Sequence, residues 1–147
     1  MAPSTGAPRT GTPHRALVLA VVAVGGAVGS LGRYALGRLL TDAMVATLVG
    51  NVLGCLALGL VLGWFPRLPQ RPVLLHAFCC VGVLGGFTTF STFAVLTIQT
   101  ASAGHLVLAA LEVIGSVLVG LLAVLLGHGL ARRLSPPRAS TPEPGQP

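Results

Sequence analysis

Four long apolar stretches constrain the fold of this chain more than any other feature of its sequence. They cover about residues 16–32, 44–65, 73–98 and 106–130, and the first is expected to continue as a helix to Leu40. A helix crosses a bilayer with roughly 20 apolar residues, each rising about 1.5 Å. Only 8% of the 147 residues are charged, too few for the surface of a soluble domain. The sequence therefore predicts an all-α membrane protein with four transmembrane helices.

The segments outside these stretches are short or polar. Connections over about residues 41–43, 66–72 and 99–104 are short enough to place successive helices side by side and antiparallel. Residues 1–14 and 132–147 are rich in Pro, Ser and Thr, a composition typical of disordered tails.

A single transmembrane domain is therefore expected over residues 15–131, with no large soluble enzyme module. Its first span continues past Gly32 to Arg33 without a clear small-residue cleavage site. This favours an uncleaved helix over a signal peptide.

The charged residues are mostly arginines near the ends of the apolar stretches. The net charge is +6, and such flanking arginines are typical of membrane loops rather than of a nucleic-acid-binding surface. The three cysteines, Cys55, Cys79 and Cys80, lie inside apolar stretches without CxxC or metal-site spacing. We interpret them as small packing residues of membrane helices.

The arginines are distributed unequally between the two sides that four spans define. The side with both termini has seven, and the other side has two. The seven are Arg9, Arg15, Arg67, Arg71, Arg132, Arg133 and Arg138; the two are Arg33 and Arg38. Cytoplasmic loops carry an excess of Lys and Arg, so both termini are predicted to be cytoplasmic in the dominant orientation.

Small residues recur four positions apart in every span. The pairs are Gly25/Gly29, Gly50/Gly54, Gly59/Gly63, Gly82/Gly86 and Ser116/Gly120. Such pairs let helix backbones approach closely inside a membrane, so they predict tight packing faces.

The sequence GVLGGFTTFSTF, residues 82–93, is unusual for a membrane helix. Gly85 and Gly86 are expected to weaken the helix near the middle of the membrane, and four hydroxyl side chains follow. Broken backbone at that depth needs burial or an aqueous cavity, where carbonyls bind cations while N–H groups and hydroxyls bind anions. The alternative is an unbroken helix whose Ser and Thr side chains bond to the preceding turn.

Three further side chains are candidates for a site inside the membrane. Phe90 and Phe93 are three apart and share a face if the helix resumes; their positive ring edges can line a path for a small anion. They can equally be packing or lipid-facing aromatics. Asn51 supplies an amide with two N–H donors, either for an anion or for joining helices.

These segments resemble the fluoride channel family, known as Fluc or CrcB. The resemblance lies in GGAVGSLGRY, residues 25–34, ATLVGNVLGCLALG, residues 46–59, and above all residues 82–93, with IGS at residues 114–116 as a weaker match. It implies an antiparallel, dual-topology dimer of four-helix subunits with a broken third helix. It also implies two fluoride paths at the dimer interface that let cytoplasmic fluoride leave the cell passively.

The resemblance also assigns residues. A central structural Na⁺ would be held by the backbone carbonyls of Gly85 and Thr88 from both subunits. Six side chains would form the fluoride path: Asn51, Phe90, Ser91, Thr92, Phe93 and Ser116.

The chain departs from the family pattern at two places. Many relatives have a Glu shortly after the second Phe, and this chain has none, whereas Glu112 lies one helical turn before Ser116. A small four-helix proton-coupled multidrug exporter is therefore an alternative, with Glu112 as its membrane carboxylate, and a non-transporting scaffold is a third. The arginine asymmetry and these departures favour pairing with a second, oppositely oriented homologous subunit over a dual-topology homodimer.

Overall fold

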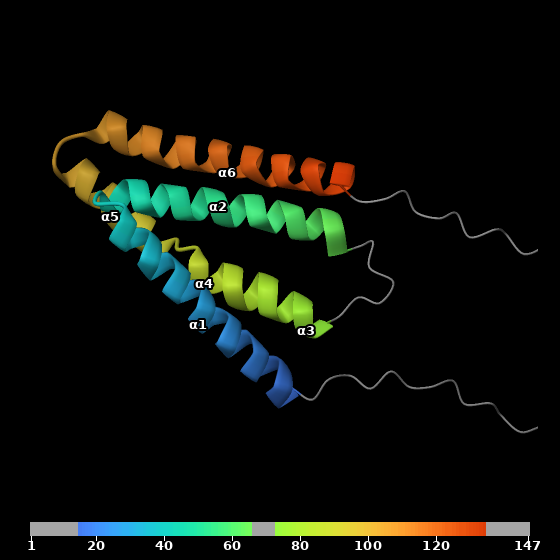
Figure 1. Ribbon diagram of the computed structural model, residues 1–147. Coiled ribbons are helices and arrows are strands. Elements are labelled where there is room, and N and C mark those ends of the chain that lie inside the picture. The colour runs from blue at the N-terminus through green and yellow to red at the C-terminus, as the bar shows by residue number, and fades with distance from the viewer. Residues whose placement is uncertain (1–14, 66–72, 135–147) are drawn as a thin grey trace, which may run out of the picture.

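The computed structural model describes residues 15–65 and 73–134, and every regular element in them is helical (Figure 1). The elements are α1 Arg15–Leu39, α2 Ala43–Trp64, α3 Val73–His76, the π-helix η2 Ala77–Leu84, α4 Gly85–Phe87, α5 Ser91–Ser102 and α6 Leu106–Leu134. The expected N-terminal tail, the loop over residues 66–72 and the chain from residue 135 lie outside the described residues. So do Arg9, Arg67, Arg71 and Arg138.

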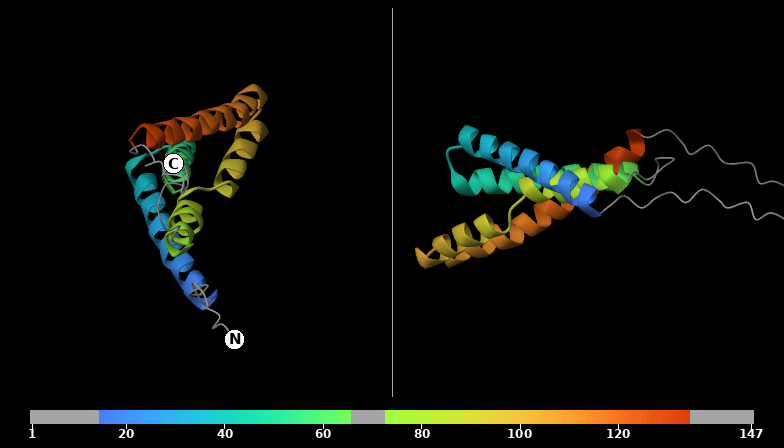
Figure 2. Two further views of the ribbon diagram at one scale, coloured as in Figure 1. Left: turned by 90° about the vertical axis from the view of Figure 1, so that its right-hand side faces the viewer. Right: turned by 90° about the horizontal axis from the view of Figure 1, so that it is seen from below.

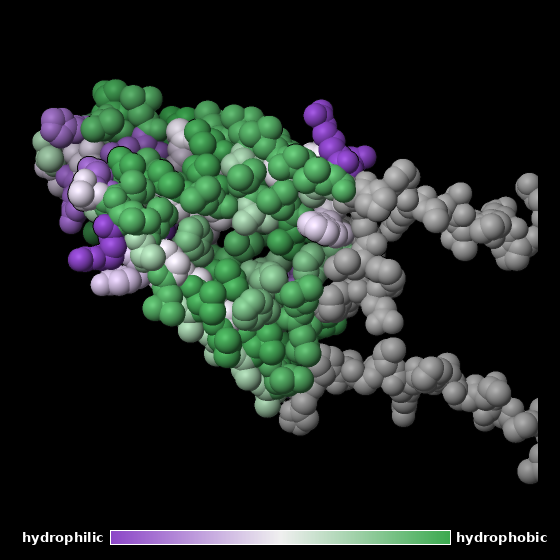
Figure 3. Space-filling model, in the orientation of Figure 1, coloured by the Kyte–Doolittle hydropathy of each residue, from purple (hydrophilic) through white to green (hydrophobic). Residues whose placement is uncertain are grey.

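Four helical spans in the described chain are long and apolar enough to cross a membrane. They are Arg15–Leu39, Ala43–Trp64, Val73–Ser102 and Leu106–Leu134. Apolar residues cover most of the face in Figure 3, and polar residues gather at its ends, as expected for a surface in contact with lipid. The predicted all-α, four-span membrane fold is confirmed. The last helix continues to Leu134, three residues past the expected domain boundary.

The third span changes partners along its length. In its first half, η2 and α4 pack along α1, whereas α5 packs against α6 and α2. The two views of Figure 2 show α5 diverging from α1 toward the start of α6. The helix α2 contacts every other span and packs most extensively along α6. The first residues of α1 and the last of α6 lie at the same end of the bundle (Figure 1), as four antiparallel spans require.

Glycines bring the helix backbones together as their spacing predicted. On α1, a Cβ at Gly25 or Gly29 would collide with carbonyl oxygens of η2, and a Cβ at Gly86 would collide with the Gly26 carbonyl oxygen. Gly59 on α2 and Gly127 on α6 meet the opposite backbone in the same way. These contacts fix α1 against the first half of the third span and α2 against α6.

The break in the third span lies later than expected. Gly85 and Gly86 are both helical in α4, and the helix stops at Thr88, whose ψ of 154° is extended. The chain resumes as α5 at Ser91. The prediction of a broken third helix is confirmed, but its location at the glycine pair was wrong, because Gly86 is held against α1 and supports the helix there. The π-helical stretch before it, Ala77–Leu84, was not predicted.

Candidate functional site: a groove at the helix break

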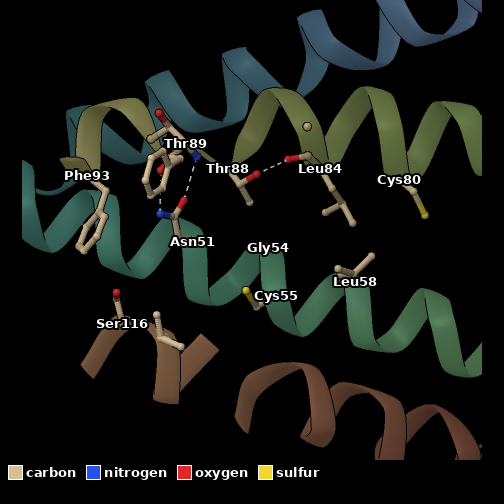
Figure 4. Close-up of a pocket in the computed structure, with 13 residues that line it drawn as sticks. Asn51, Gly54, Cys55, Leu58, Cys80, Leu84, Thr88, Thr89, Phe93 and Ser116 are labelled. Atoms are coloured by element: carbon tan, nitrogen blue, oxygen red, sulfur yellow. Dashed lines mark hydrogen bonds between the residues drawn. The ribbon is translucent and has the colours of Figure 1, made fainter. Parts of the chain in front are cut away.

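Asn51 binds the backbone at the break through both ends of its amide. Its Nδ2 donates to the Thr89 carbonyl oxygen at 2.9 Å, and its Oδ1 accepts from the Thr89 N–H at 2.9 Å (Figure 4). These two bonds replace helical bonds that the interrupted backbone has lost. Asn51 therefore joins helices and also lies at the candidate site, and it keeps one N–H of Nδ2 for a further acceptor.

The threonines on either side of the break have different roles. Thr88 turns back, and its Oγ1 donates to the Leu84 carbonyl oxygen at 2.8 Å. The Oγ1 of Thr89 accepts from the Thr92 N–H at 3.3 Å and so caps the start of α5. The same oxygen lies 3.2 Å from Ser91 Oγ and donates to Thr92 Oγ1 at 3.3 Å. Three hydroxyls thus form one hydrogen-bonded cluster at the N-terminus of α5.

An open groove of about 450 Å³ runs along the break, between α2, the third span and α6. Most of the residues predicted for a site line it, and they come from segments far apart in the sequence. These are Asn51, Gly85, Thr88, Phe90, Phe93 and Ser116, together with Thr89. Ser91 and Thr92 are not among the lining residues; they are exposed at the start of α5 and reach the groove only through the Thr89 hydroxyl.

The two phenylalanines have opposite environments. Phe93 is packed within the subunit, with only 8% of its surface exposed, whereas Phe90 is 81% exposed. Phe90 is the N-cap of α5; its dihedral angles are helical, and its carbonyl oxygen accepts from the Ala94 N–H at 2.9 Å. Both line the groove, but only Phe93 has its position determined by contacts inside one subunit.

The fourth span contributes Ser116 to the groove and turns Glu112 toward α5. Ser116 Oγ donates to the Val113 carbonyl oxygen at 2.9 Å. Glu112 Oε1 accepts from Thr100 Oγ1 at 3.2 Å, and its buried Oε2 has no hydrogen-bond partner in the described chain. Glu112 is absent from the lining of the groove. The Thr100 contact was not predicted, because nothing in either segment alone indicates it.

The backbone carbonyls at the break divide into bonded and free ones. Leu84 accepts from the N–H and hydroxyl of Thr88, and Phe87 accepts from Arg33. Within the described chain, the carbonyls of Gly85 and Thr88 accept no hydrogen bond, and both residues line the groove. Uncommitted carbonyl oxygens suit a hard monovalent cation, and no group of three or more His, Cys, Asp or Glu side chains in the described residues offers another metal site.

The family model described as CrcB-like protein, Camphor Resistance (CrcB), matches residues 20–128, which include most of each of the four spans and every residue that lines the groove. The chain belongs to this CrcB family. Among its relatives, a protein named fluoride-specific ion channel FluC from Methylobacterium sp. (strain 4-46) is 39% identical over 116 residues, covering 76% of this chain and 94% of the relative.

Two further CrcB relatives have the same description. The FluC protein of Paramagnetospirillum magneticum is 42% identical over 120 residues, covering 76% of this chain and 93% of the relative. A protein of Streptomyces avermitilis named fluoride-specific ion channel FluC 3 is 40% identical over 119 residues, covering 78% of this chain and 58% of that protein. The similarity therefore extends across the membrane domain of this CrcB chain.

Proposed function

We propose that this chain is a subunit of a passive, fluoride-selective channel that lets cytoplasmic fluoride leave the cell and so reduces its toxicity. The names of its CrcB relatives support a channel rather than an enzyme. The observation that carries the proposal is the groove at the helix break, where an amide, hydroxyls and aromatic rings converge inside a multi-pass membrane protein.

The chemistry of the groove suits a small, strongly hydrated anion. Asn51 and the hydroxyl cluster of Thr89, Ser91 and Thr92 offer hydrogen-bond donors that can replace water around fluoride without a fixed positive charge. No acidic residue lines the groove in the described chain, so no carboxylate there repels an anion. Several weak sites, instead of one strong site, let the ion leave as well as enter.

The open groove supports a dimer in which a second subunit completes the path. Phe90 extends from the subunit with most of its ring uncovered, and a Cβ at Gly85 would meet no atom within 4 Å. An antiparallel partner would cover this face and bring a second set of carbonyls to the first. Gly85 and Thr88 of both subunits would then hold a structural Na⁺ at the dimer centre. Because the ligands are main-chain oxygens, Thr88→Ser should retain the ion.

The distribution of arginines supports unequal partners. Arg33 is hydrogen-bonded to Phe87 and Thr47, which makes it a packing residue more than a loop charge and strengthens the seven-to-two asymmetry. This subunit would then insert with both termini in the cytoplasm. An antiparallel dimer needs the opposite orientation too, so a second, oppositely biased homologue is the expected partner, and a dual-topology homodimer is the alternative.

The direct test is fluoride efflux from liposomes, followed with a fluoride electrode under a valinomycin-clamped potassium gradient. We expect fluoride release with little chloride release, from this chain alone or together with its homologue. Equal rates for the two anions would contradict the proposal. C-terminal tags that report only in the cytoplasm or only outside should show one dominant orientation, whereas comparable signals from both would favour the homodimer.

The alternative of a proton-coupled multidrug exporter is not favoured. Its one candidate membrane carboxylate, Glu112, faces Thr100 of α5 and does not line the groove.

A further inference from the structure

Arg33 is a charged residue inside the first span, and its guanidinium bridges two other spans. Its Nη1 donates to the Phe87 carbonyl oxygen at 3.2 Å, and its Nη2 donates to Thr47 Oγ1 at 3.3 Å. Thr47, on α2, is 2% exposed and is the one buried polar residue in the described chain. A charge inside a membrane is costly without such partners, so this arrangement calls for a specific explanation.

The partner carbonyl belongs to the last residue before the break. Phe87 ends α4, and the carbonyls of a last helical turn have no partner within their own helix. A guanidinium at that end satisfies one carbonyl and is also favoured by the negative end of the helix dipole. Arg33 thus acts as a side-chain cap, supplied by α1, for the first half of the third span.

Arg33 and Asn51 together account for the polar backbone groups around the break. Arg33 holds the Phe87 carbonyl, and Asn51 holds the N–H and carbonyl of Thr89. The carbonyl between them, that of Thr88, has no hydrogen bond in the described chain. The two side chains approach from different helices and leave the carbonyl oxygens of Gly85 and Thr88 without a hydrogen bond at the groove in the described chain.

Gly50 provides the room that the guanidinium needs. A Cβ at Gly50 would lie 2.9 Å from Arg33 Nη1 and 3.3 Å from Leu36 Cδ2. An alanine at position 50 would displace the Arg33 guanidinium from its two acceptors without removing its charge. By contrast, a Cβ at Gly37, one turn after Arg33 on α1, would meet nothing within 4 Å.

We propose that Arg33 is a positioning residue for the ion path: its two-pronged contact with Phe87 and Thr47 fixes where the third helix breaks. The role depends on the planar geometry of the guanidinium and not on its charge alone, since Arg33 reaches the two acceptors from two separate nitrogens, whereas a lysine has one nitrogen on a flexible stem. The effect on flux rests on the proposed channel function, whereas the effect on the break does not.

The test compares R33K, R33Q and G50A with the matched controls R38K and G37A, all purified in the full chain. Arg38 is exposed on the same helix and has no contact of the kind made by Arg33 in the described chain. Fluoride efflux should fall by about tenfold in all three test variants and in neither control, since each loses roughly one charge-assisted hydrogen bond. Amide hydrogen exchange over residues 85–92 should accelerate in the same three variants.

A second measurement separates positioning from general damage. Added guanidinium ion should partly restore efflux through R33A. The same ion should not change efflux through the control R38A. If R33K does not assemble, T47V decides the matter: it keeps the charge and the Phe87 contact but removes the second acceptor, and exchange at residues 85–92 should still accelerate.

Several outcomes overturn the proposal. Wild-type flux and exchange in R33K together with a defect in R33Q would mean that only the charge matters. Unchanged exchange in G50A and T47V would mean that the two guanidinium contacts do not hold the break. Wild-type protein that conducts no fluoride, with exchange altered as expected in the variants, would contradict the proposed function and leave the positioning role supported.

Discussion

The two halves of the third span are held in place by different kinds of contact. The first half, Val73–Phe87, fits against α1 through glycines whose backbones touch backbone across the interface. The second half, Ser91–Ser102, is joined to its neighbours by side chains, among them the Thr100 contact with Glu112. It also leaves Phe90 uncovered next to its first turn.

This difference separates rigidity from function within a single helix. Close backbone packing has no spare room, so the first half can serve as a fixed reference for the break. Side-chain hydrogen bonds can exchange partners, so the second half can offer its donors to an ion without dismantling the bundle. The groove lies at the junction of the two halves of the third span, and Asn51 and Thr88 line it.

The largest effect is expected from adding a methyl group to α1 where it packs on the first half of the third span. In G29A the new Cβ would overlap the Val83 carbonyl oxygen, and neither backbone can move without disturbing the packing of α1 on η2. Overpacking of this kind costs about 1–3 kcal/mol, enough to lower the thermal midpoint or prevent assembly. Thermal unfolding and size-exclusion chromatography in detergent measure both.

The matched control is G85A, a glycine of the third span itself. Its Cβ would meet nothing within 4 Å in the subunit, so the subunit itself should fold normally. Any defect in G85A should be confined to dimer formation or flux. Equal loss of subunit stability in G29A and G85A would mean that the rigid half is not defined by these backbone contacts.

The second effect concerns the amide at the boundary. N51A leaves the N–H and carbonyl of Thr89 without their partner, at about 1 kcal/mol for each bond, and should lower fluoride efflux by about tenfold. N51D keeps the acceptor for the Thr89 N–H but turns a carboxylate oxygen toward the Thr89 carbonyl oxygen, so it should disturb the break and also place a repelling charge in the groove. Efflux near wild type in N51D would argue against an anion passing this residue.

A smaller effect distinguishes the two phenylalanines. F93I and F90I both remove a ring edge from the groove and should both reduce fluoride flux. Only F93I should also destabilise the isolated subunit, by about 1 kcal/mol, because Phe93 is packed and Phe90 is 81% exposed. Unfolding curves and efflux, measured on the same preparations, test whether both variants lose flux while only F93I loses stability. Wild-type flux in both variants would mean that the rings serve only packing.

The sequence was sufficient to predict the spans and much of the packing. Apolar length identifies a membrane helix because each span must satisfy its own backbone, and glycine spacing identifies a packing face because only small residues allow backbones to touch. Gly25 and Gly29 illustrate this, since their spacing alone predicted a packing face, and that face lies against the third span.

The position of the break could not be read from its own segment. The glycine pair indicated a weak point, but Gly86 is supported by α1, and the Thr89 N–H is taken by Asn51, which lies 38 residues earlier. The environment of Phe90 was hidden for the same reason, because it depends on where α5 begins. Each of these outcomes depends on tertiary contacts.

The smallest effect is expected at Glu112, and it separates a channel from an exporter. In E112Q the amide oxygen can still accept from Thr100. The new amide nitrogen replaces Oε2, which has no hydrogen-bond partner in the described chain, so the substitution removes no hydrogen bond. Since the side chain faces α5 and does not line the groove, stability should change by less than about 1 kcal/mol and fluoride efflux should stay near wild type. A proton-coupled exporter needs a carboxylate that gains and loses a proton, so E112Q would abolish its transport. A fluoride electrode, combined with a pH-sensitive dye inside the liposomes, distinguishes the two. Substrate-linked proton movement that disappears in E112Q would reverse the assignment and make Glu112 a coupling site.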